Sequence, residues 1–184
     1  MLVDVTLKIT PKMAADAQGN EKKALVGHLG THFDVMNKEF PLEYAKRKGI
    51  VFDVSHVKDR DIALEDVEIA HVEKDMFVAF YSGFDEDYGS RAYFNEHPQL
   101  SNALIDQLLE KGVSLIGVDF AGLRRGTEHT PKDQYCANRG VFVVENLCNL
   151  NLILDSSASE LVFYTFPMHY VDVTGLPCRV LVEL

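Results

Sequence analysis

Short runs of apolar residues, separated by polar and turn-forming residues, recur along the whole chain. The runs are rich in valine, isoleucine and phenylalanine, which is typical of β-strands. They predict strands over residues 2–9, 25–29, 50–54, 76–81, 113–118, 141–144, 152–154, 161–166 and 178–182. Runs this short and this numerous indicate that a sheet carries most of the core.

One segment shows helical periodicity, with an apolar stripe formed by Leu104, Ile105, Leu108 and Leu109. It predicts a helix over residues 101–111 that ends at Gly112. Shorter helices are expected over residues 132–138 and 41–48. Many strands with few helices favour an α/β domain of the mixed α+β kind. No repeat or linker divides the chain, so we expect residues 1–184 to form a single domain.

The composition is that of a soluble globular protein, with 47% apolar and 25% charged residues. The formal net charge is −10, and acidic residues are dense between positions 53 and 75, which we interpret as a solvated surface. This charge argues against nucleic acid as a partner, because phosphate binding needs a basic surface. The chain shows neither a bilayer-spanning apolar run nor a signal peptide, so no membrane partner is expected. Cys136, Cys148 and Cys178 form no CxxC pair and are expected to be free thiols, which agrees with a cytoplasmic location.

The stretch from His28 to Asp34 reads His-Leu-Gly-Thr-His-Phe-Asp and places two histidines and an aspartate at even spacings. In an extended chain these side chains share one face, because side chains alternate along a strand. A straight strand would hold His28 and Asp34 about 20 Å apart, whereas the ligands of one ion converge to about 2 Å from it. We therefore expect the chain to bend, and Gly30 is the residue that tolerates a bend. The stretch predicts a metal site containing His28, His32 and Asp34.

Glu145 directly follows the apolar run at residues 141–144. A carboxylate at the inner end of a buried strand is costly unless a cation or hydrogen-bond donors satisfy it. An exposed strand end, or pairing with Arg139 or Arg179, would also explain this residue. Beside the histidine motif, a metal role is the better interpretation. Three or four nitrogen and oxygen ligands with an open position suit Zn²⁺ or Mn²⁺ and a bound water.

The chain resembles the cyclase family of metal-dependent hydrolases, which includes bacterial kynurenine formamidase and isatin hydrolase. The family signature H-x-G-T-H-x-D-x-P-x-H matches fully over its first seven positions, residues 28–34. The similarity continues in order through residues 94–98, 117–119 and 143–147, and so spans essentially the whole chain. It implies a swivelling β/β/α domain with a mixed central sheet and flanking helices. It also implies that His28, His32, Asp34 and Glu145 bind metal, with Glu145 a candidate bridge to a second ion.

The chain departs from the family pattern in two places. The signature continues with a proline and a catalytic histidine, where this chain has Met36 and Lys38. Lys38 is the candidate proton donor, although lysine donates less readily than imidazole near pH 7; the alternative is a surface lysine, with another side chain doing this work. The family commonly has a histidine twelve residues before the glutamate, where this chain has Asp133. Asp133 or nearby His129 could complete a second site, and His129 is equally explained as a polar loop residue, so one or two ions are expected.

The resemblance implies a hydrolase that cleaves an amide, formamide or cyclic amide C–N bond, as arylformamidases do, through a metal-activated water. Arg124 and Arg125 follow a predicted strand end and could hold a carboxylate of the small-molecule substrate; surface charge or an intersubunit salt bridge explains them as well. The alternative function is a metal- or small-molecule-binding protein on the same fold, whose hydrolytic activity has been lost or redirected. Family members are usually dimers or tetramers, so a homodimer or homotetramer is expected.

Overall fold

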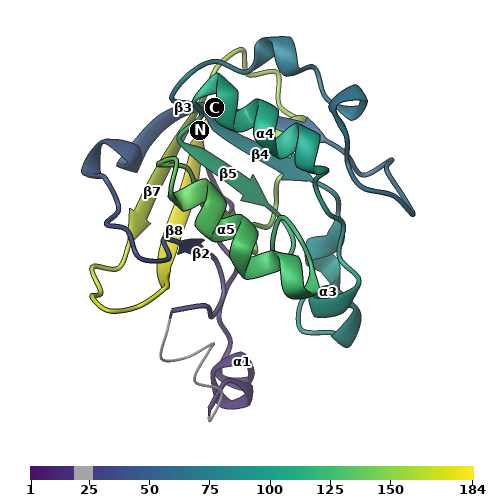
Figure 1. The fold of residues 1–184 in the computed structure, drawn as a ribbon. Coiled ribbons are helices and arrows are strands. Elements are labelled where there is room, and N and C mark those ends of the chain that lie inside the picture. The colour runs from purple at the N-terminus through teal and green to yellow at the C-terminus, as the bar shows by residue number, and fades with distance from the viewer. Residues whose placement is uncertain (19–26) are drawn as a thin grey trace.

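The computed structural model describes residues 1–18 and 27–184, and Figure 1 shows the course of the chain. The strands are β1 (Leu2–Asp4), β2 (His32–Asp34), β3 (Lys46–Asp53), β4 (Phe77–Tyr81), β5 (Leu115–Val118), β6 (Phe142–Glu145), β7 (Leu161–Pro167) and β8 (Gly175–Glu183). The α-helices are α1 (Pro11–Asp16), α3 (Arg91–Asn95), α4 (Asn102–Lys111), α5 (His129–Ala137) and α6 (Asn151–Leu154). Short 3₁₀ helices are η1 (Leu42–Ala45), η2 (Leu64–Asp66), η3 (Ile69–His71), η4 (Phe84–Asp87) and η5 (Gly126–Glu128). None of these helices is long and apolar enough to cross a membrane.

The strands form one mixed sheet in the order β1-β8-β2-β6-β5-β4-β3-β7. Strands β3 to β6 run parallel, and the remaining pairings are antiparallel. Strand β8 also pairs with β7, so the sheet closes on itself, and β1 lies outside the ring beside the C-terminal end of β8. This architecture confirms the expected fold class, a mixed sheet with flanking helices.

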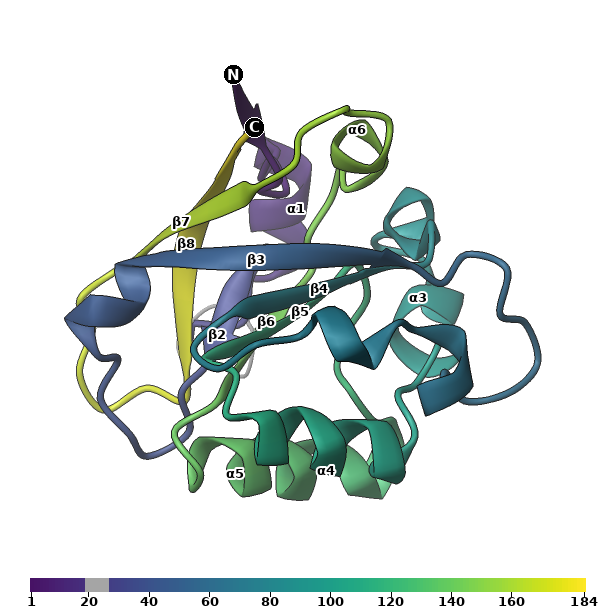
Figure 2. The same cartoon turned by 90° about the horizontal axis from the view of Figure 1, so that it is seen from above.

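Alternation along the strands divides the core into two parts. In β4, Val78 and Phe80 point to one side and pack with the apolar stripe of α4, while Phe77 and Ala79 point into the closed sheet. Figure 2 shows α4 and α5 side by side against the outside of the parallel strands. Residues from β2, β7 and β8 fill the interior together with Phe77. The helices therefore cover one face of the parallel strands, and strands β2, β7 and β8 cover the other.

Several expected elements are confirmed. Helix α4 begins where the Ser101 hydroxyl accepts a hydrogen bond from the Leu104 amide, and it ends at Gly112, whose φ is 73°. The helix expected over residues 132–138 is present as α5, which starts earlier, at His129. The parallel strands β4, β5 and β6 lie within the apolar runs that predicted them, apart from the terminal Glu145. The bend expected at Gly30 is also present, because its φ is 74°.

Other expectations are wrong. Residues 152–154 were expected to form a strand and instead belong to helix α6, because a three-residue apolar run carries no periodicity that separates strand from helix. The helix expected over residues 41–48 is limited to η1, since β3 begins at Lys46 and pairs there with β7. The strand expected over residues 25–29 begins outside the described residues, and its described part, 27–29, is turn and bend.

Candidate metal centre

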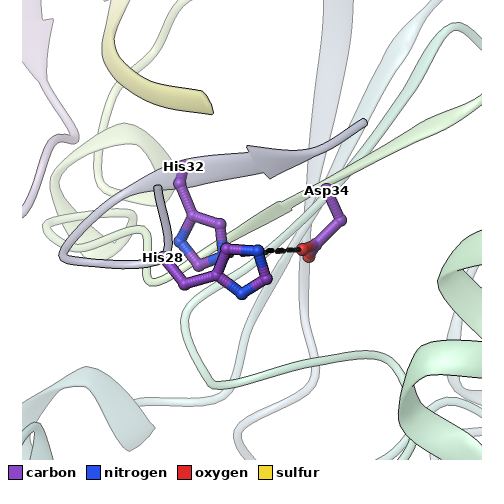
Figure 3. Close-up of side chains that lie close together, drawn as sticks. All are labelled: His28, His32 and Asp34. Atoms are coloured by element: carbon purple, nitrogen blue, oxygen red, sulfur yellow. Dashed lines mark ion pairs between the residues drawn. The ribbon is translucent and has the colours of Figure 1, made fainter. Parts of the chain in front are cut away.

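The first part of the site is built by strand β2 and the turn before it. His32 and Asp34 alternate on one face of the strand, and the turn at Gly30 brings His28 back over His32. The two imidazole rings stack with their centroids 4.8 Å apart. The Asp34 Oδ1 atom lies 3.8 Å from His28 Nε2 and 3.7 Å from His32 Nε2. Figure 3 shows these side chains gathered in one place, as the spacing of the motif predicts.

The second part comes from helix α5 and the end of strand β6. His129 and Asp133 are four residues apart on one face of the helix, with His129 Nε2 3.2 Å from Asp133 Oδ2. The same nitrogen lies 3.3 Å from Glu145 Oε1. Antiparallel pairing places Glu145 directly opposite His32, and their Oε2 and Nε2 atoms are 3.6 Å apart. Sheet register thus joins the two parts of the site.

The potential ligands form two groups that share one residue. In the first, ligand atoms of His28, His32 and Asp34 lie within 4.8 Å of one another. In the second, the same limit holds for Asp34, His129, Asp133 and Glu145. The structure therefore brings together all six sequence-predicted ligands, and it gives the shared position to Asp34, whereas the resemblance suggested Glu145 as the bridge.

The ligand set fits a cation. Within the part of the chain that the structure describes, four buried side-chain atoms at this site have no hydrogen-bond partner: His32 Nε2, Asp34 Oδ2, Asp133 Oδ1 and Glu145 Oε1. Each unsatisfied buried polar group costs about 1–3 kcal/mol, and more when it is charged. Such a concentration of unsatisfied acceptors is what a divalent cation would relieve.

The pKa values also indicate that the site lacks positive charge to balance its carboxylates. Burial and the positive charge of His32 lower the pKa of His28 to about 4, so its imidazole is neutral. Burial would raise the pKa of Asp34, but the interactions with His32, His28 and His129 together outweigh burial and lower it. Burial and the negative charge of Asp34 raise the pKa values of Asp133 and Glu145 well above their usual range. The closed site cannot hold its three carboxylates ionised at little cost without additional positive charge.

Two glycines allow the ligands to approach the backbone. A Cβ atom on Gly122, whose φ is 114°, would lie 2.5 Å from His129 Cε1 and 3.0 Å from Glu145 Oε1. A Cβ atom on Gly175 would lie 2.1 Å from His28 Cδ2. The 2.5 Å and 2.1 Å contacts are too close for a Cβ atom, so both backbone segments form part of the wall of the site.

Lys38 lies in the turn that follows β2, and its side chain is exposed. Its backbone amide donates to the Val35 carbonyl oxygen. Within the described ranges, no hydrogen bond or ion pair joins its ammonium group to the ligand cluster. Lys38 is thus close to the cluster in sequence, and its side chain is exposed.

The two candidate arginines differ in their surroundings. The Arg124 guanidinium is occupied within the chain, with Nη1 2.5 Å from Asp61 Oδ2 and Nε 2.7 Å from Glu128 Oε2. Arg125 makes one long side-chain hydrogen bond, 3.4 Å from Nη1 to the Asn95 carbonyl oxygen. It helps to line a surface groove of about 450 Å³ together with Phe94, Asn95, Gln99, Arg124, Gly126, Thr127 and Glu128. Arg125 is therefore the better placed of the two to meet a ligand.

Sequence reasoning assigned no chemical role to several residues that contact the ligands or the backbone beside them. The Thr174 hydroxyl lies 3.0 Å from His28 Nε2. The Asn146 amide lies 3.4 Å from His32 Nδ1. Burial, with the charge of Glu145, raises the pKa of Tyr88, whose phenol hydrogen-bonds to the Gly30 backbone. Nothing local in the sequence marks these residues, because sheet pairing and loop packing bring them to the site from distant segments.

Comparison with known proteins supports the family resemblance seen in the sequence. A family model described as a putative cyclase matches residues 3–123, about two thirds of the chain. No curated protein sequence matches the chain.

The fold is shared with solved structures, among them the following three. One, described as a potential metal-dependent hydrolase with cyclase activity, has a TM-score of 0.77 at 22% identity, over 99% of this chain and 96% of its own. A predicted metal-dependent hydrolase from Bacillus stearothermophilus has a TM-score of 0.75 at 22% identity, over 99% and 97%. Isatin hydrolase A from Labrenzia aggregata, bound to benzyl benzoate, has a TM-score of 0.73 at 19% identity, over 99% and 93%. With the family match over most of its length, the chain belongs to the cyclase family.

Proposed function

We propose that the protein is a metal-dependent hydrolase that cleaves the C–N bond of an amide, formamide or cyclic amide. The observation that carries this proposal is the set of four buried side-chain atoms without a hydrogen-bond partner on His32, Asp34, Asp133 and Glu145. The printed descriptions of the structural neighbours, metal-dependent hydrolase and isatin hydrolase, agree with it.

We assign two adjacent ion positions that share Asp34. His28 and His32 would complete the first, and His129, Asp133 and Glu145 the second. Histidine nitrogens and carboxylate oxygens suit Zn²⁺ or Mn²⁺. The bound metal would supply a Lewis acid and lower the pKa of a bound water.

The chain itself prepares the site in three ways. Neutral His28 offers a lone pair without losing a proton first. Side chains of His32, Asp34 and Glu145 are at most 5% exposed, so they are held away from bulk water. His28 and His129 remain 28% and 30% exposed, and the substrate would therefore approach from their side.

Lys38 is the proposed proton donor to the leaving nitrogen, and Arg125 the proposed contact for an anionic substrate group. General acid catalysis typically contributes a factor of about 10² to 10⁴. We expect Lys38→Ala to keep its metal content and to lose at least about 10² in kcat. Unchanged turnover in this variant would exclude Lys38 from the reaction.

The test is elemental analysis of purified wild type and Glu145→Ala, with Glu110→Ala as a matched control. Glu110 is an exposed glutamate on α4, outside the cluster. Wild type and the control should hold one or two equivalents of zinc or manganese, and Glu145→Ala should hold less. Loaded wild type is then assayed with formamides, cyclic imides and lactams. Little metal in wild type after reloading would refute the metal centre, and full metal content without turnover would favour the alternative of a binding protein.

A further inference from the structure

Asn146 adopts an unusual conformation next to the ligand cluster. It follows Glu145 directly, is 4% exposed, and has a φ of 58°, in the left-handed region. Its side-chain amide makes two hydrogen bonds inside the protein. Nδ2 donates to the Gly30 carbonyl oxygen at 2.8 Å, and Oδ1 accepts from the Tyr93 hydroxyl at 2.7 Å. A buried amide with both ends engaged is fixed in one orientation.

The chemistry of the partners assigns that orientation. A carbonyl oxygen only accepts hydrogen bonds, so the amide atom facing Gly30 must be the nitrogen. The oxygen then faces Tyr93, whose hydroxyl is the donor. Tyr93 is itself fully buried, and the Ser90 side chain caps its backbone amide at the start of α3. Helix α3 is thereby connected to Gly30 through a single side chain.

The same carbonyl oxygen determines the tautomer of His32. His32 Nδ1 lies 2.9 Å from the Gly30 oxygen and must carry the proton there, because two acceptors would repel each other. Asn146 Nδ2, 3.4 Å from Nδ1, is also a donor and offers no competing acceptor. In the neutral ring, Nε2 is then the nitrogen without a proton, and it is one of the four buried atoms at this site without a hydrogen-bond partner.

We propose that Asn146 and Tyr93 are positioning residues that clamp the Gly30 carbonyl and thereby hold His32 in the Nδ1–H tautomer. Two donors converge on one carbonyl oxygen, so its direction is fixed, and the ring that bonds to it cannot turn. Groups that orient metal-ligating histidines typically change metal affinity by a factor of about 10 to 100 when removed. The inference rests on the proposed metal centre for its consequence, while the tautomer itself is a property of the metal-free chain.

The test uses two variants and two matched controls. Asn146→Gly removes the amide at a position where glycine tolerates the positive φ, and Tyr93→Phe removes only a hydroxyl and keeps the ring. Asn149→Gly is the first control, because Asn149 has a φ of 57° and its amide donates to the Asp4 carbonyl oxygen, away from the cluster. Tyr44→Phe is the second control, since the Tyr44 hydroxyl donates to the Gly140 carbonyl oxygen.

Two readouts separate the outcomes. The first is the ¹⁵N spectrum of the histidine side chains in metal-free protein at pH 8, and the second is zinc affinity measured by competition with a chelator. We expect a single Nδ1–H tautomer of His32 in wild type and both controls, and a tautomer mixture in Asn146→Gly with at least a tenfold loss of zinc affinity. Tyr93→Phe should shift both readouts in the same direction by less.

The result that overturns the inference is a wild-type tautomer and a zinc affinity within twofold of wild type in both Asn146→Gly and Tyr93→Phe. If wild type itself binds neither zinc nor manganese, the proposed function fails. In that case the ¹⁵N spectra of the metal-free proteins still decide whether Asn146 and Tyr93 hold His32.

Discussion

His97 is expected to make the stability of the fold depend on pH. The residue is 1% exposed, its Nδ1 donates to the Pro98 carbonyl oxygen at 2.7 Å, and its ring stacks on Phe120 with centroids 5.5 Å apart. Burial lowers the pKa of His97 to about 4, and the positive charges of Arg125 and His129 act in the same direction, against the hydrogen bond to Pro98. The folded protein therefore holds this imidazole neutral.

The sign and size of the effect follow from proton linkage. In the unfolded chain the imidazole has a pKa near 6.5. Below that pH the unfolded state binds a proton that the folded state does not bind until the pH approaches 4. The stabilisation is complete above pH 6.5 and is lost as the pH falls toward 4. With these two pKa values, the free energy of unfolding decreases by about 2 kcal/mol between pH 7.5 and pH 5 from this residue alone.

Urea unfolding at a series of pH values measures this effect, with His97→Asn as the comparison. The asparagine amide can still donate to the Pro98 carbonyl oxygen, but it does not titrate. Both proteins are kept metal-free, so His28, whose pKa is also lowered to about 4, contributes equally to each. We expect the difference between the two unfolding free energies to change by about 2 kcal/mol over this pH range. Parallel pH profiles for wild type and variant would refute the reasoning.

Two further predictions concern the stability of the metal-free protein and its affinity for zinc. Asp133→Asn should raise the thermal midpoint of metal-free protein at pH 8, because burial and the charge of Asp34 oppose ionisation of Asp133. The midpoint of the same variant should rise less than that of wild type when zinc is added. A lower midpoint than wild type in the presence of chelator would contradict this prediction. Gly122→Ala should weaken zinc binding, because the new Cβ atom would displace His129. Gly126 also has a positive φ but has nothing within 4 Å of an added Cβ, so Gly126→Ala should cost about 1 kcal/mol of stability and keep the metal. Equal zinc affinity in both variants would show that Gly122 does not shape the site.

The first half of the cluster could be predicted from sequence because it is local. His28, His32 and Asp34 belong to one short stretch, and a single glycine accounts for the bend between them. Glu145 could be suspected from its place after a buried run. Its position opposite His32, however, depends on the register between β2 and β6, which no local pattern contains.

The remaining features depend on tertiary contacts. Asn146 and Tyr93 are 53 positions apart, and only the fold brings the hydroxyl to the amide. The sequence left His129 open between a ligand and a loop residue. The start of α5 decides its place, because helical spacing then puts His129 and Asp133 on one face. The position of His129 therefore depends on where α5 begins, and the ends of helices and strands are the features that sequence patterns define least well.

Charge balance links the two proposed ion positions. The cluster contains three carboxylates, and its two ligand groups share Asp34. One divalent ion would leave a net charge of about −1 if all three were ionised, and two ions would give about +1. The raised pKa values of Asp133 and Glu145 already show that the buried site resists further negative charge. Two ions would allow all three carboxylates to ionise, and the remaining positive charge would favour an anionic species at the exposed side of His28 and His129. Asp34, common to both groups, is therefore the residue through which the occupancy of one position would affect the other.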